Sequence, residues 1–196
     1  MIDSFFRSPY QKWVVSPLLE KKFFLAFSPH FFTFLAALTG LLIPFLLLGQ
    51  CTYLAFIFLI LSGFFDTIDG SLARKRSQAS PTGAAFDILS DRFVEFCIVL
   101  GLLLIDPAAR ALPALFVLGS IFLCVTSFLI VGVFEKNDSE KSFHYSAGLI
   151  ERAEAFIFFG LMILLPSFFT PLAFLFSGLV FFTAVARIYH FSKTHN

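Results

Sequence analysis

The apolar character of this chain is the feature that most restricts its fold. Of its 196 residues, 58% are hydrophobic and only 14% are charged. Apolar windows of about twenty residues recur along the sequence, and an α-helix needs about that length to cross the hydrocarbon core of a bilayer. An ordinary soluble domain does not have this composition, so we expect an all-α integral membrane protein.

Six membrane-spanning helices are predicted from these windows. Gly49-Gln50 and the pair Pro166 and Pro171 provide short breaks between neighbouring windows. Asp106-Pro107 ends the third helix, because the residue before a proline disfavours helical geometry. We place the helices near residues 30–49, 51–74, 83–105, 111–135, 148–166 and 168–191. The length leaves no room for a second sizeable domain, so residues 28–196 are interpreted as one membrane domain.

The N-terminal region, residues 1–27, mixes large apolar side chains with basic ones. Trp13 and several phenylalanines alternate there with residues such as Lys12 and Lys21. This mixture predicts one or two amphipathic helices that lie in the headgroup region of the membrane, with Trp13 at interfacial depth. A frayed, basic N-terminus is the alternative.

The basic residues predict the orientation in the membrane. Only Arg110 falls on the side opposite to the others, and Arg92 lies about two turns inside the third helix. By the positive-inside rule, the termini and the loops at 75–82 and 136–147 are therefore cytoplasmic. The residues on this side are Arg7, Lys12, Lys21, Lys22, Arg74, Lys75, Arg76, Lys136, Lys141, Arg152, Arg187 and Lys193.

Neither the net charge nor the cysteines indicate a further function. A formal charge of +1 gives no support to a nucleic-acid partner. The cysteines Cys51, Cys97 and Cys124 show no metal-ligand spacing, and we expect inert thiols.

Four aspartates gather at the adjoining ends of the second and third predicted helices. Each charge at the centre of a bilayer costs roughly 2.5–3.5 kcal/mol, so four together need a compensating partner. Asp66 and Asp69 are three residues apart and share a helix face, as do Asp87 and Asp91, four apart. Two antiparallel helices joined by a short turn bring these faces together. Oxygen ligands alone favour Mg²⁺ or Mn²⁺ over zinc.

Small residues and one arginine accompany the carboxylates. Gly70, Ala73 and Gly83 leave space where a base or a phosphate can approach the backbone, and Arg74 offers a planar charge that matches phosphate geometry. This combination favours a nucleotide-diphosphate site over a proton path. Capping carboxylates and helix packing through small residues would explain one or two of these positions, but not all eight.

The complete pattern resembles the motif of the CDP-alcohol phosphotransferase family, also called CDP-alcohol phosphatidyltransferases. It reads Asp66-x₂-Asp69-Gly70-x₂-Ala73-Arg74-x₈-Gly83-x₃-Asp87-x₃-Asp91. The resemblance implies that the four aspartates bind two divalent metals, Mg²⁺ or Mn²⁺, and that Asp91 is also the general base. It further implies that a set of residues contacts the nucleotide and its diphosphate, namely Asp69, Gly70, Ala73, Arg74 and Gly83.

The reaction implied by the resemblance is phosphatidyl transfer from CDP-diacylglycerol to a polar alcohol, with release of CMP. Members of the family are commonly homodimers, and a lipid-linked donor enters sideways from the bilayer. A small CDP-alcohol donor with a lipid acceptor is an alternative. A cation transporter that uses the same carboxylates, or a catalytically silent membrane scaffold, is a further one.

The acceptor is less clearly indicated. Asp91-Arg92 and Gly148-Leu-Ile-Glu151-Arg152 resemble the phosphatidylinositol-phosphate synthase branch of the family, in which basic residues collect the acceptor's phosphate. By this resemblance Lys136, Arg152 and Arg187 bind the acceptor, although they also suit positive-inside anchors. The branch's Ser-Tyr-x-basic-Ala-Arg-Ala-Glu stretch is replaced at 131–138, and His30 stands where the family usually has asparagine. A phosphorylated polyol such as inositol phosphate or glycerol phosphate is our first expectation, and a neutral alcohol is the second.

Overall fold

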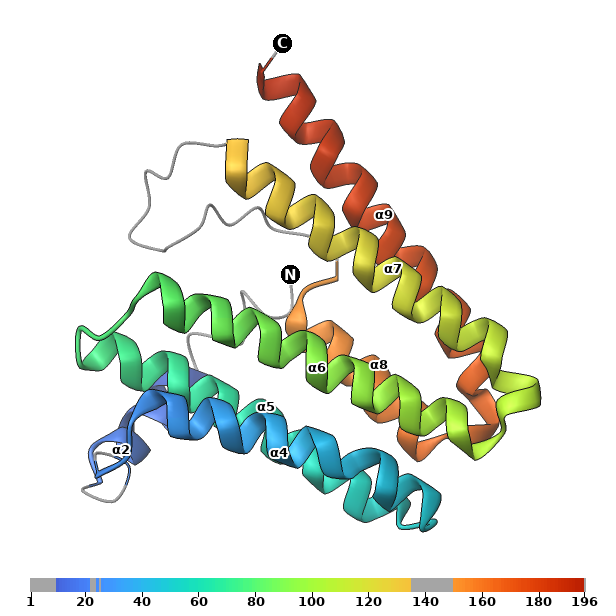
Figure 1. Ribbon diagram of the computed structural model, residues 1–196, viewed down its shortest axis with the longest axis horizontal. Coiled ribbons are helices and arrows are strands. Elements are labelled where there is room, and N and C mark those ends of the chain that lie inside the picture. Colours follow the sequence, from blue (N-terminus) through green and yellow to red (C-terminus); the bar gives the residue numbers. More distant parts are fainter. Residues whose placement is uncertain (1–9, 22–23, 25, 135–149, 196) are drawn as a thin grey trace. The chain divides into compact units, whose positions relative to one another are not determined.

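The computed structural model describes residues 10–21, 24, 26–134 and 150–195, and every regular element within these ranges is helical (Figure 1). The chain divides after Ile105 into two compact units. The predicted all-α class is confirmed. In chain order the elements are η1 (Gln11–Val15), α2 (Ser16–Leu19), α4 (Pro29–Leu48), α5 (Thr52–Lys75), α6 (Pro81–Ile105), α7 (Pro107–Phe134), α8 (Arg152–Leu164), η2 (Pro166–Phe168) and α9 (Phe169–His195).

Four helical segments of the described chain are long and apolar enough to cross a membrane. They are Pro29–Leu48, Thr52–Lys75, Pro107–Phe134 and Pro166–Thr194. The protein is therefore a multi-pass membrane protein. Helix α6 has the length but carries two aspartates and an Arg92–Glu95 ion pair between residues 87 and 95. Helix α8, with 13 residues, rises only about 20 Å, less than the roughly 30 Å of a hydrocarbon core.

Local sequence explains why α8 is shorter than the predicted 148–166 helix. Glu151 is the N-cap in a capping box: its backbone N–H donates to Glu154 Oε2 (3.2 Å), and its own side chain accepts from the backbone of Glu154. Such a box fixes a helix start at this point. At the other end Leu165 precedes Pro166 and leaves the helical conformation, as the residue before a proline tends to do. Residues 148 and 149 lie outside the described residues.

Within the first unit, α4 packs against both α5 and α6, and it approaches α6 closely at two glycines. A Cβ atom at Gly101 would lie 2.8 Å from the Cα of Pro44, and one at Gly40 would lie 2.6 Å from Cγ2 of Val94. Small residues at such crossings let helix backbones approach in a membrane protein. These two glycines therefore set the distance between α4 and α6.

Replacement of Gly101 by alanine is expected to destabilise the protein by about 1–3 kcal/mol, because the new methyl group meets backbone that cannot rotate away. The thermal unfolding midpoint of the detergent-solubilised protein measures this loss. Gly119→Ala is the matched control, since a Cβ atom there meets nothing within 4 Å. An equal loss in both variants would contradict the close α4–α6 packing.

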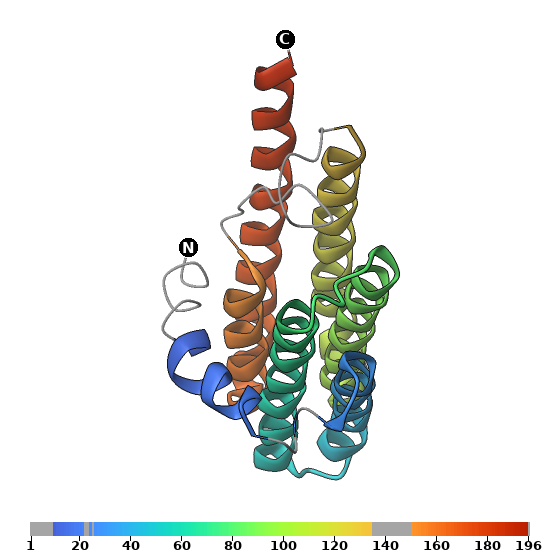
Figure 2. The ribbon, with the colours of Figure 1, turned by 90° about the vertical axis from the view of Figure 1, so that its left-hand side faces the viewer.

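In the second unit, α7 and α9 lie side by side, as Figures 1 and 2 both show. Arg110, near the start of α7, is buried. Its Nη2 donates to the carbonyl oxygen of Pro166 (2.8 Å), and its guanidinium lies 4.9 Å from the ring centre of Phe169. The arginine thus satisfies a carbonyl at the break before α9. This contact gives Arg110 a structural role, which accounts for a basic residue on the side of the membrane that is predicted to be opposite to the other basic residues.

The N-terminal segment packs against the C-terminal part of α5. Val15 and Leu19 are buried in a cluster with Phe32, Ile68 and Leu72. Nζ of Lys75 donates to the carbonyl oxygen of Leu19 (3.1 Å). Trp13, by contrast, is 77% exposed, so the segment has one buried and one open face.

Candidate active site

Three acidic side chains converge between α5 and α6. Asp66 and Asp69 of α5 are buried and Asp87 of α6 is half-buried, and one carboxylate oxygen from each lies within 4.8 Å of the others. Oxygen atoms bound to one Mg²⁺ or Ca²⁺ ion lie at roughly 2.0–2.6 Å from it, which places any two of them within roughly 5 Å of each other. The three carboxylates therefore fit a hard divalent cation, both in chemistry and in spacing.

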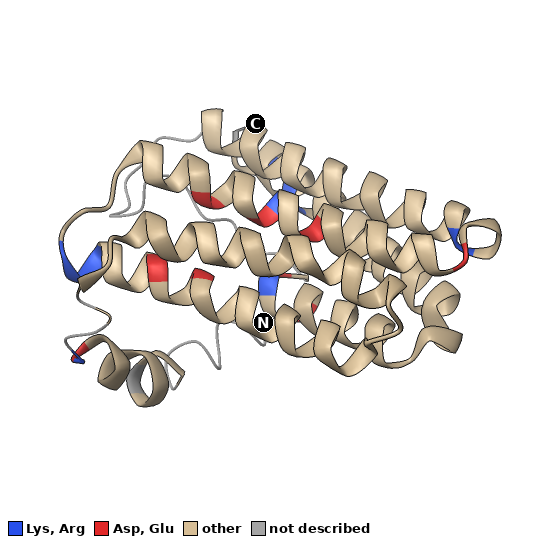
Figure 3. Ribbon diagram, turned by 60° about the horizontal axis from the view of Figure 1, so that its bottom comes forward, with Lys and Arg blue, Asp and Glu red and all other residues tan. Residues whose placement is uncertain are grey.

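The surroundings of these carboxylates also fit a cation. Oδ1 of Asp66 and Oδ2 of Asp69 are buried and accept no hydrogen bond from the described part of the chain, although both residues make other polar interactions. Charged residues are sparse along the helices (Figure 3), so the group lies among apolar segments. Like charges at this separation repel each other strongly in a medium of low dielectric constant. A bound divalent ion offsets that repulsion.

The structure does not include Asp91 in this group. Asp91 is half-buried on α6, four residues beyond Asp87. A spacing of four residues displaces it by about 6 Å along the helix axis. Of the four aspartates expected to converge, the structure brings Asp66, Asp69 and Asp87 together, and metal binding by all four stays a prediction.

The side chain of Arg74 folds back along α5 toward Gly70, which lies one helical turn earlier. Its Nη1 is 3.3 Å from the position that a Cβ atom of Gly70 would occupy, and its Nη2 donates to Oγ of Ser71 (3.2 Å). Ala73, next to it, is half-buried. The absence of a side chain at Gly70 thus leaves room for the guanidinium beside the carboxylate-bearing part of α5.

Gly83 and His30 are neighbours at the start of α6. The backbone N–H of Gly83 donates to Oγ of Ser80 (3.1 Å), and Cε1 of His30 lies 3.8 Å from the position of a Cβ atom at Gly83. The imidazole also meets the ring of Phe86 edge to face, with 6.3 Å between ring centres. His30 therefore lies beside a residue of the family motif, although it departs from the usual asparagine.

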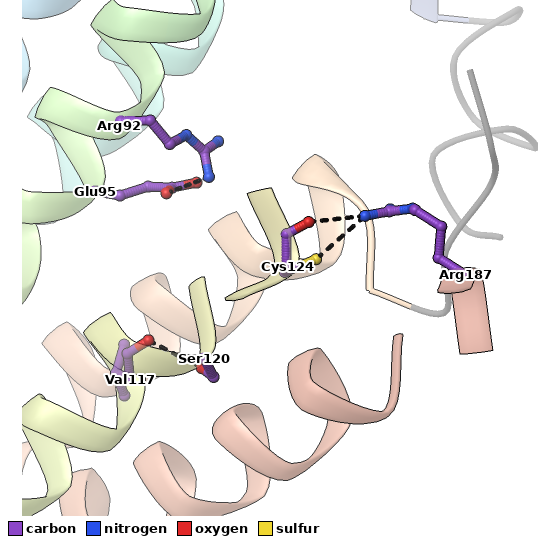
Figure 4. A network of polar contacts seen from close by, with 6 residues as sticks. All are labelled: Arg92, Glu95, Val117, Ser120, Cys124 and Arg187. Atoms are coloured by element: carbon purple, nitrogen blue, oxygen red, sulfur yellow. Dashed lines mark hydrogen bonds and ion pairs between the residues drawn. The ribbon is translucent and has the colours of Figure 1, made fainter. Parts of the chain in front are cut away.

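Two of the predicted acceptor residues, Arg152 and Arg187, contact other residues of the second unit. Nη1 of Arg187 donates to the carbonyl oxygen of Cys124 (2.9 Å; Figure 4) and to Oγ of Ser127 (3.0 Å). The guanidinium of Arg152 lies 5.7 Å from the ring centre of Phe156. Lys136 lies outside the described residues.

Sequence reasoning missed two polar features near the aspartates. Arg92 forms an ion pair with the buried Glu95 (2.7 Å; Figure 4), and Gln11 donates to Ser71 (3.0 Å). Opposite charges three residues apart on an apolar helix signal the first feature. No local pattern signals the second, because 60 residues separate its partners.

A helical, multi-pass membrane protein with a carboxylate group suited to a divalent cation is the class that this fold and site define. The sequence profile of the CDP-alcohol phosphatidyltransferase family matches residues 26–190. The chain belongs to this family of enzymes.

Known proteins similar to this chain include one matched over most of its length. The inner membrane protein YnjF of Escherichia coli is 30% identical over 161 residues, which are 78% of this chain and 77% of that protein. The CDP-diacylglycerol–inositol 3-phosphatidyltransferase of Rattus norvegicus is 37% identical over 71 residues, 36% of this chain and 33% of the rat enzyme. The match therefore spans about a third of the rat enzyme's length.

A solved structure shares the fold. The crystal structure of the Mycobacterium tuberculosis phosphatidylinositol phosphate synthase, with CDP-DAG bound, superposes with a TM-score of 0.73 at 18% identity. The superposition covers 91% of this chain and 93% of that one. At this identity the likeness establishes the architecture.

Proposed function

We propose that the protein transfers a phosphatidyl group from CDP-diacylglycerol to a polar alcohol and releases CMP. The observation that carries this proposal is the convergence of Asp66, Asp69 and Asp87 within the motif of the matched family. The neighbour solved with CDP-DAG and the rat inositol phosphatidyltransferase support this choice of donor.

In this proposal Asp66, Asp69, Asp87 and Asp91 hold two divalent ions, Mg²⁺ or Mn²⁺. The ions, when bound, supply positive charge that offsets the charge of the diphosphate and of the departing CMP. Asp91 accepts the proton from the acceptor hydroxyl, which then attacks the β-phosphorus. Its place outside the group of three supports this separate role.

The remaining motif residues orient the donor. Arg74 donates hydrogen bonds to the diphosphate, and its planar guanidinium suits phosphate oxygens. Gly70, Ala73 and Gly83 present no bulky side chain, so the nucleotide can lie against the backbone of α5 and α6. Together these residues bind and align the donor, while the carboxylates serve the metals and the proton transfer.

Lys136, Arg152 and Arg187 bind the acceptor in this proposal, and a phosphorylated polyol is its first candidate. One structural observation supports this role for Arg187. Its Nε is buried and has no hydrogen-bond partner among the residues that the structure describes, which leaves a charged donor for a phosphate oxygen. Inositol phosphate and glycerol phosphate both offer such an oxygen.

We further propose six membrane spans, a site that faces the cytoplasm, and a homodimer. Residues 28–196 are the membrane domain, and residues 1–27 lie at the cytoplasmic surface. The exposed Trp13 opposite the buried Val15 supports the surface location, because tryptophan favours the headgroup region.

The decisive experiment supplies the purified full chain in lipid nanodiscs with CDP-diacylglycerol, Mg²⁺ and one of four acceptors. Inositol phosphate, glycerol phosphate, serine and inositol are compared by CMP release and by identification of the lipid product. We expect release that EDTA stops and Mg²⁺ restores. Absence of CMP with every acceptor, together with Mg²⁺-stimulated cation flux through the same protein in liposomes, would overturn the proposal in favour of a transporter.

A further inference from the structure

We propose that Ser71 and Gln11 are positioning residues that hold the guanidinium of Arg74 toward the diphosphate. Ser71 is not one of the residues of the family motif, and Gln11 precedes the matched region, residues 26–190, altogether. Oγ of Ser71 accepts hydrogen bonds from Nη2 of Arg74 (3.2 Å) and from Nε2 of Gln11 (3.0 Å). The inference rests on the proposed function in one respect, because it assumes that Arg74 contacts the CDP moiety.

Arg74 needs such support because of its place on α5. It is an exposed residue in the last turn of the helix, and Arg76 directly follows the helix end. A long side chain in this place has many rotamers, and ordering one of them on binding costs conformational entropy. The bond to Ser71 and the open space over Gly70 select a conformation that is folded back along the helix. The guanidinium is thereby ordered before the donor arrives.

Ser71 is suited to this role because it is itself fixed. It is 7% exposed, and it lies on α5 next to the buried Leu72. A serine hydroxyl has two acceptor lone pairs, so one oxygen can receive both the guanidinium and the amide. The two bonds therefore share one atom, and movement of either donor affects the other.

Gln11 is anchored independently of Arg74. Its segment is held by the buried side chains of Val15 and Leu19 and by the bond from Lys75 to the carbonyl oxygen of Leu19. The amide of Gln11 consequently reaches Ser71 from a separately packed element. By this route the N-terminal segment contributes to the site, although it carries none of the motif residues.

The test measures the KM for CDP-diacylglycerol and the kcat of CMP formation in Ser71→Ala and Gln11→Met, with the most effective acceptor at saturation. Ser71 and Gln11 support the contact of Arg74 with the diphosphate, which is made equally in the ground and transition states. The KM should therefore rise while kcat changes little. We expect the KM to rise about ten- to a hundredfold in Ser71→Ala, within the range that loss of a hydrogen bond to a charged group gives. Gln11→Met should show a smaller rise, and Ser71→Thr, which retains the hydroxyl, should restore the wild-type KM.

Ser120→Ala is the matched control. It removes another buried serine hydroxyl, which donates only within its own helix, to the carbonyl oxygen of Val117 (2.9 Å; Figure 4). Its KM should equal that of the wild type. Thermal unfolding midpoints of all variants separate a loss of stability from a loss of donor binding. A Ser71→Ala protein with a lower unfolding midpoint and an unchanged KM would overturn the positioning role. Ser71 would then only stabilise the fold.

A double-mutant cycle gives the second readout. In an Arg74→Ala background, Ser71→Ala should raise the KM no further, because the two residues act through one interaction. Additive effects of the two substitutions on the KM would overturn the positioning role of Ser71. The proposed function would still stand in that case, because the wild type forms CMP. Failure of the wild type to form CMP would overturn both.

Discussion

Replacement of Asp69 by asparagine is expected to reduce CMP formation by about a hundred- to a thousandfold, the loss typical of removing one preorganised electrostatic contact from a reaction centre. Asp69 is 4% exposed and belongs to the three-carboxylate group of α5 and α6. The amide keeps the shape of the side chain but removes one negative charge from the metal site. CMP release at saturating CDP-diacylglycerol over a range of Mg²⁺ concentrations measures the effect.

The loss of activity should not be a loss of folding. Without metal, the carboxylates of the group repel one another, so in EDTA the Asp69→Asn protein should unfold at the same temperature as the wild type or a higher one. Mg²⁺ should raise the midpoint less in the variant, because ligand stabilisation depends on affinity. Asp106→Asn is the matched control, since the Asp106 side chain is exposed, lies outside the three-carboxylate group and accepts a bond from the N–H of Ala109. Wild-type CMP release by Asp69→Asn would contradict the metal site.

Residue spacing predicted which aspartates of the candidate site share one face of the same helix. Asp66 and Asp69 share a face of α5 because they are three residues apart, and the short connection after α5 brings Asp87 beside them. Spacing alone did not give the register of α6 along α5. That register decides whether Asp87 or Asp91 lies level with the aspartates of α5, and it depends on packing of α4 against α6 at Gly40 and Gly101.

The bounds of the helices were also predicted only where the sequence marks them. The expected segments 30–49 and 51–74 agree closely with α4 and α5, because long apolar windows with clear breaks define both ends. Helix α6 begins at Pro81, two residues earlier than expected, since a proline is tolerated in the first turn of a helix. The bond between Gln11 and Ser71 follows from tertiary packing alone, and hydrophobic periodicity carries no information about it.

Replacement of Asp91 by asparagine is expected to separate proton transfer from metal binding. Because Asp91 is proposed as the general base, kcat should fall about a hundred- to ten-thousandfold. Because it is also proposed as one of four metal ligands, the Mg²⁺ requirement should rise, while the KM for CDP-diacylglycerol at saturating Mg²⁺ should stay near that of the wild type. The pH profile supplies an independent readout. A general base acts only when deprotonated, so the wild-type kcat rises with pH through the pKa of the base and then levels off. That limb should disappear in the variant.

The comparison with Asp69→Asn decides between the two roles of Asp91. Neutralising Asp91 leaves Asp66, Asp69 and Asp87 in place, so Mg²⁺ should still raise the unfolding midpoint of Asp91→Asn, by less than in the wild type but by more than in Asp69→Asn. A variant that loses this stabilisation altogether and keeps the rising limb of the pH profile would assign Asp91 to the metal alone and remove it as the base. Asp91→Glu, which keeps a carboxylate but shifts it by one methylene, should recover part of kcat together with the rising limb of the pH profile.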